Sequence, residues 1–185
     1  MSWLSTTSEH RFPFMSIARS ACKVMDRCVA DVLTHASRLG HVFLAVEDTP
    51  DAFALELNAH FPHTSRLLER YAPAMVFKAP QASTDDMYDA MLREIVAQAR
   101  AVRTQCTVAL TVFGPDALRA ACHRVAKRLT AVLPKAIYTM STATSTASME
   151  ARLRQVDVHL DMIVRHATPL DLSIATPLPP VCVDL

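Results

Sequence analysis

The side chains best suited to chemistry in this 185-residue chain follow short apolar runs. If the runs are parallel strands, these side chains lie at the sheet edge where ligands bind in open α/β folds. Adjacent carboxylates there can hold Mg²⁺ or transfer a proton. The candidate ligand-binding residues are Glu47, Asp48, Thr49, Asp116, Ser141 and Thr142.

A simpler interpretation gives some of these residues an architectural role. Asp48 and Thr49 can shape a turn and cap the helix that follows. In the stretch "CTVALTVFGPDAL", Pro115 removes a backbone N–H at a helix start, which weakens any anion site there. Both interpretations stay open from the sequence alone.

The common signatures of catalysis and cofactor binding are missing. The chain has no Walker A sequence, no GxGxxG, no HExxH and no GxSxG. It has only two glycines, which argues against a glycine-rich phosphate loop. His159 and His166 are seven residues apart, too far for an i,i+4 pair of ligands. We therefore expect no catalytic residue, no cofactor and no metal.

A basic stripe is the clearest surface feature. Its spacing places several cations on one face of a helix, which could attract phosphate, RNA or an acidic protein. No aromatic residue is interleaved, so base stacking is not indicated. An ordinary solvated helix face is the alternative. The stripe consists of Arg119, His123, Arg124, Lys127 and Arg128.

The bulk composition is that of a folded protein with a large core. Half of the residues are hydrophobic, and the net charge is +1. The five cysteines lie mostly in apolar patterns without CxxC spacing, which favours reduced thiols. No apolar segment reaches the length of a membrane span. We expect an intracellular protein, cytoplasmic or nuclear, without a membrane partner.

Apolar runs alternate with segments of helical periodicity, the pattern of βαβ units. Strands are expected at 41–46, 74–80, 106–113, 135–141 and 170–175, with 106–113 at the centre. A helix after 115 should end at Pro134. The sequence predicts one three-layer α/β domain over 15–176, with a mostly parallel sheet of about five strands and helices on both faces. A mainly α fold is the alternative. Residues 1–14 should be a flexible lead-in, and 177–185 an extended Pro-rich tail.

Two stretches resemble a known family. "HASRLGHVFLAVEDTPDAF" and "KAIYTMSTATSTASMEARLRQVDVHLDMIVRHATPL" are similar in element order to the P-loop-less RecA-like subunits, such as the accessory subunits of Elongator. The chain departs from that pattern because it is short and no strand precedes its first helix. The resemblance implies a Rossmann-like scaffold in a larger complex, with tRNA as a further contact, and carries over no catalytic residue.

These observations favour a non-catalytic subunit that works by protein–protein interaction in a homo- or hetero-oligomer. One alternative is a small enzyme or ligand-binding domain with its site at the strand ends. Another is a subunit that contacts RNA or phosphate through the basic stripe.

Overall fold

The computed structural model describes residues 19–71, 73–78, 83–102, 106–139 and 146–174. The predicted lead-in 1–14, the tail 177–185 and the candidate residues Ser141 and Thr142 lie outside these ranges.

Strands and helices alternate along the chain, as predicted, so the mainly α alternative is wrong. The strands are β1 (Phe43–Val46), β2 (Ala74–Phe77), β3 (Val108–Gly114), β4 (Val132–Thr139) and β5 (Leu170–Ile174). The helices are α1 (Arg19–Leu39), α2 (Pro50–His60), α3 (Pro62–Tyr71), α4 (Thr84–Val102), α5 (Asp116–Arg128) and α6 (Thr146–Arg165).

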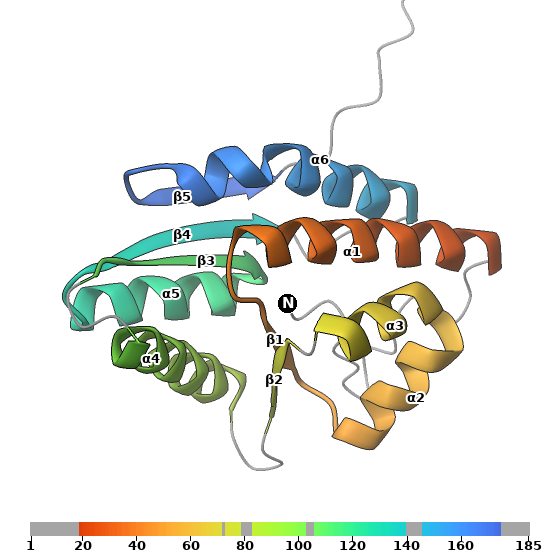
Figure 1. Cartoon of the computed structure of the whole chain (residues 1–185), viewed down its shortest axis with the longest axis horizontal. Helices are drawn as coiled ribbons and strands as arrows, with labels where there is room; N and C mark the ends of the chain where they lie inside the picture. Colours follow the sequence, from red (N-terminus) through yellow and green to blue (C-terminus); the bar gives the residue numbers. More distant parts are fainter. Residues whose placement is uncertain (1–18, 72, 79–82, 103–105, 140–145, 175–185) are drawn as a thin grey trace, which may run out of the picture.

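The five strands form two parallel sheets, which corrects the prediction of a single sheet. β1 pairs with β2, and β3, β4 and β5 form a second sheet in that order. Among the described residues β3 is therefore an edge strand of its sheet, which contradicts the prediction that it is central. Figure 1 shows β1 and β2 running steeply across the direction of β3 and β4. β1 and β3 share no hydrogen-bonded ladder, so the sheet is split between them.

Helices nevertheless cover both faces. Leu44, Phe113 and Ile137 belong to a hydrophobic cluster with α1 and α6. Leu110 and Ala136 belong to another with α4 and α5. Successive side chains of a strand point to opposite faces, so the two clusters are the two sides of one layer of strands. Figure 1 shows the same three-layer arrangement.

The fourth strand begins earlier than predicted. Helix α5 ends at Arg128, and Pro134 lies inside β4 instead of ending the helix. Pro134 is paired in register with Leu110 of β3, whereas pairing with β5 begins only at Lys135 and Leu170. The nitrogen of Val108 donates to Ala131, and strand residues alternate in direction, so the Pro134 nitrogen faces the β5 side. A proline is tolerated there because no partner strand has yet begun.

Candidate functional site

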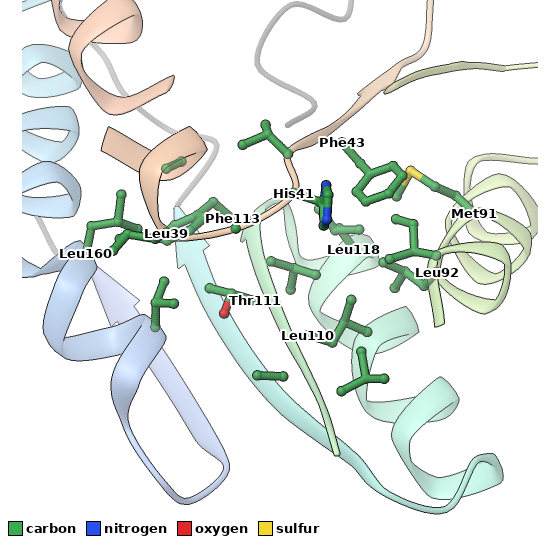
Figure 2. Close-up of a pocket in the computed structure, with 18 of the residues that line it drawn as sticks. Leu39, His41, Phe43, Met91, Leu92, Leu110, Thr111, Phe113, Leu118 and Leu160 are labelled. Atoms are coloured by element: carbon green, nitrogen blue, oxygen red, sulfur yellow. The ribbon is translucent and has the colours of Figure 1, made fainter. Parts of the chain in front are cut away.

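A cleft occupies the split in the sheet. This sheet cleft has a volume of about 260 Å³ and touches both helical layers. Figure 2 shows Leu39 and Leu160 on one side of it, and Met91, Leu92 and Leu118 on the other. One wall consists of six consecutive residues of β3, Val108 to Phe113. Because consecutive strand residues face opposite ways, the cleft lies along the edge of β3 and not on one face.

The cleft is almost entirely apolar. Among the described residues that line it, only His41 and Thr111 are polar and none is charged. The residues of β3 that bond to β4 alternate with Ala109, Thr111 and Phe113, whose backbone groups point toward the cleft. Within the described ranges, these three residues have no ladder partner on that side. The cleft therefore combines an apolar surface with unpaired peptide groups.

The described strand-end candidates take different partners. Glu47 accepts a hydrogen bond from the Tyr88 hydroxyl at 2.8 Å. Thr49 caps α2 by accepting from the Ala52 nitrogen at 3.4 Å, as predicted. Asp116 pairs with Arg119 at 3.1 Å, and Asp48 follows Glu47 in the turn. No group of three His, Cys, Asp or Glu side chains in the described ranges could hold a metal ion.

The basic stripe lies on α5, but carboxylates from other elements accompany it. Arg119 binds Asp171 of β5 at 2.6 Å, and His123 lies 3.2 Å from the same side chain. The hydrogen bond from Arg119 lowers the pKa of Asp171. These contacts neutralise the β5 side of the stripe.

The α4 side of the stripe is neutralised in the same way. Arg124 binds Asp89 of α4 at 2.8 Å, and Arg128 lies 3.7 Å from the other carboxylate oxygen. Lys127 is exposed, and the described residues include no ion-pair partner for it. The sequence could not reveal this neutralisation, because Asp89 and Asp171 are remote in the chain.

A surface groove runs between α1 and α6. This α1–α6 groove has a volume of about 400 Å³. Its apolar residues are Val24, Cys28, Leu153 and Val158, and its charged residues are Arg27, Asp31, Arg154 and Asp157. Met162, one turn after Val158 on α6, is also exposed. The groove thus presents apolar side chains between charges of both signs.

His35 of α1 forms hydrogen bonds to α6 beside this groove. Its Nδ1 lies 3.0 Å from Asp157 and its Nε2 lies 2.9 Å from Asp161. Both ring nitrogens can donate only in the imidazolium form. The hydrogen bonds with Asp161 and Asp157 accordingly raise the pKa of His35. Sequence reasoning missed this cluster, although Asp157 and Asp161 are spaced i,i+4 on one helix face.

Two buried side chains of reactive types, Lys135 and Cys122, have structural roles. The Lys135 ammonium, in β4, donates to the Val164 carbonyl in the last turn of α6, where helix carbonyls need donors. Burial lowers the pKa of Lys135. Burial also raises the pKa of the Cys122 thiol to about 12, so it is not a ready nucleophile. Neither side chain lines the sheet cleft or the groove.

No described helix combines the length and apolar character needed to cross a bilayer. Comparison with protein-family models, curated proteins and solved structures found no match to this chain.

Proposed function

We propose that this chain is a non-catalytic α/β subunit that binds a protein partner through the α1–α6 groove. The observation that carries the proposal is the exposure of Val158 and Met162, whose residues are 74% and 59% accessible to solvent. They lie one turn apart on α6, so they form one apolar stripe beside the groove. Val24 of α1 adds to it from the other wall.

The chemistry of the groove favours an amphipathic helix as the bound element. A helix inserts apolar side chains at i, i+3 and i+4 into such grooves, and its flanking charges pair at the rim. Arg27 would meet an acid of the partner, and Asp31 would meet a base. Arg154 is already paired with Glu150 at 2.8 Å. A polyanion such as RNA is less well supported, since acids of the same chain accompany the basic stripe.

The test introduces negative charges into the apolar stripe. The full chain is tagged and purified from cells of its source, beside the double variant Val158→Glu/Met162→Glu. Val102→Glu is the matched control, because Val102 is 83% exposed at the end of α4, outside the groove lining. All three proteins should melt at similar temperatures, since the changed side chains are exposed.

We expect a stoichiometric protein partner with the wild type and with Val102→Glu, and its loss with the double variant. Cross-links from the partner should map to a helix. A chain that binds the same proteins whether or not the stripe is charged would contradict the proposal. Sedimentation of the pure chain distinguishes a second copy from a different protein.

A further inference from the structure

The outer edge of β5 is open among the described residues. β5 pairs with β4 on one side and has no ladder partner there on the other. Figure 1 shows it on the side of β4 away from β3. Its three middle residues are exposed, and Leu172 is 37% accessible to solvent. An edge strand with free peptide groups is a template on which another strand can pair.

The ladder of the sheet decides which peptide groups of β5 face outward. The nitrogen of Val108 donates to Ala131, and strand residues alternate in direction, so Ala136 bonds to the β5 side. Ala136 is in register with Asp171, and in a parallel ladder it bonds to the residues on either side of that partner. The peptide groups of Asp171 and Ser173 therefore point away from β4.

The usual protections of an edge strand are missing from β5. Edge strands are commonly blocked by lysine, proline or other charged residues. The sequence of β5, "LDLSI", has neither lysine nor proline, and its single charge belongs to Asp171. That carboxylate is neutralised by Arg119 of α5 at 2.6 Å. By contrast β2, which ends the other sheet, is shorter and is followed directly by Lys78.

From these features we propose that two copies of this chain associate by antiparallel pairing of their β5 strands about a twofold axis at Leu172. Each Leu172 then lies opposite the same residue of the second copy, with Cα atoms about 4.5 Å apart. Asp171 lies opposite Ser173 of the second copy, and the two exchange both backbone hydrogen bonds. None of these residues lines the α1–α6 groove, so the dimer does not depend on the proposed function.

Charge and polarity select this register. An axis at Asp171 would bring two carboxylates face to face, and like charges directly opposite each other are destabilising. With the axis at Leu172, the Ser173 hydroxyl of the second copy can donate to the Asp171 carboxylate. On the other face, Leu172 points to the same side as Leu170 and Ile174, which pack against the cluster of α1 and α6. Leu172 is nevertheless exposed, so α6 leaves room for a second leucine beside it.

The association should be weak. Stable interfaces bury about 1,200–2,000 Å² in total, and the edge of a five-residue strand supplies only part of this area. We therefore expect a dissociation constant on the order of 10–100 μM. Because a twofold axis uses up the same edge on both copies, association should stop at the dimer.

The experiment combines sedimentation of the full chain over a range of concentrations with nuclear magnetic resonance on a mixture of labelled and unlabelled chains. We expect a monomer–dimer equilibrium and a contact between the Leu172 Hα protons of differently labelled chains. The amides of Asp171 and Ser173 should be protected from exchange at high concentration and lose this protection on dilution.

Leu172→Lys should raise the dissociation constant roughly 100-fold or more, because two ammonium groups would meet at the axis. Met75→Lys is the matched control, since Met75 is 42% exposed in the edge strand β2, and it should leave the dimer intact. A wild type that stays monomeric up to about 1 mM would overturn the inference. So would a dimer without the Leu172 contact, a dimer whose contacts map to the α1–α6 groove, or one that Leu172→Lys leaves unchanged. The wild-type measurement decides even if Leu172→Lys does not fold.

Discussion

The carboxylate of Asp26 lies in α1 but caps a different helix. It is buried, and it accepts hydrogen bonds from the His63 and Thr64 nitrogens of α3 at 2.8 Å each. The Thr64 hydroxyl adds a third bond at 2.8 Å. Asp26→Ala would leave these donors unpaired inside the protein, so we expect it to lower the free energy of unfolding by about 2–4 kcal/mol.

Thr49→Ala is the comparison for this prediction. Thr49 caps α2 locally and in an exposed position, where water can replace it. Its loss should cost only about 0.5–1 kcal/mol. Urea denaturation measures both values, and equal costs would show that burial of the Asp26 cap adds nothing.

Ala131 has a strained backbone. Its φ is 53°, in the left-handed region, where a Cβ costs about 1–2 kcal/mol. Ala131→Gly removes that cost but loses more entropy on folding, so we expect a net gain of about 0.5–1 kcal/mol. Ala126→Gly, inside α5, should instead lose about 1 kcal/mol. A loss of stability at both positions would argue against the left-handed turn before β4.

At the scale of elements, the ion pairs of Arg124 and Arg128 with Asp89 join α5 to α4. The Asp89 side chain is only 12% exposed, and Arg124 at 2.8 Å is a closer partner than Arg128 at 3.7 Å. Arg124→Ala should lower the free energy of unfolding by about 1–2 kcal/mol. Lys127→Ala removes the same charge from the same helix and should change it by less than about 0.5 kcal/mol. Thermal melts of the two variants that coincide would mean that the α4–α5 pair contributes no stability.

The junction of α1 and α6 should respond to pH. The pKa of His35 is raised in the folded protein, so its stabilising effect is complete below its ordinary value of 6.5. The effect is lost as the pH rises through the folded pKa. Relative to His35→Gln, the wild type should therefore melt roughly 1–2 °C higher at about pH 6, with the difference fading toward pH 9. A difference that does not depend on pH would show that His35 contributes by packing alone.

At the scale of the molecule, the sequence predicted what local rules decide. The βα alternation follows from apolar periodicity, and the start of α2 follows from the side chain of Thr49. The division of the five strands into two sheets could not be predicted from these local rules. Whether β1 pairs with β3 depends on how all the helices and strands pack together, and that is a property of the whole chain.

In the candidate site, too, the sequence predicts the local features but not the contacts between remote residues. The position of the cations on α5, away from its buried residues, could be predicted from their spacing. Their neutralisation depends on Asp89 and Asp171, which approach only in the folded protein. The burial of Lys135 was also hidden, because a lysine at the start of an apolar run usually marks the end of a strand. Here the carbonyl of Val164 compensates the ammonium group.

The two sheets should unfold together despite the split. Each hydrophobic cluster contains residues of both sheets: Leu44 and Ile137 in one, Ala45 and Leu110 in the other. Shared side-chain packing couples the sheets even where no ladder joins them. We therefore expect one cooperative transition, with equal calorimetric and van't Hoff enthalpies.

Two core truncations at opposite ends of the molecule test this coupling. Leu57→Ala in α2 and Val125→Ala in α5 both remove buried methyl groups, and the leucine change should cost about 2–4 kcal/mol. In a single cooperative unit, each variant shifts the whole transition and lowers the protection of amides in both sheets. If the sheets were independent, Leu57→Ala would produce an early transition involving β1 and β2 while β3 to β5 kept the wild-type melting temperature. Calorimetry with hydrogen exchange resolved by residue distinguishes these two outcomes.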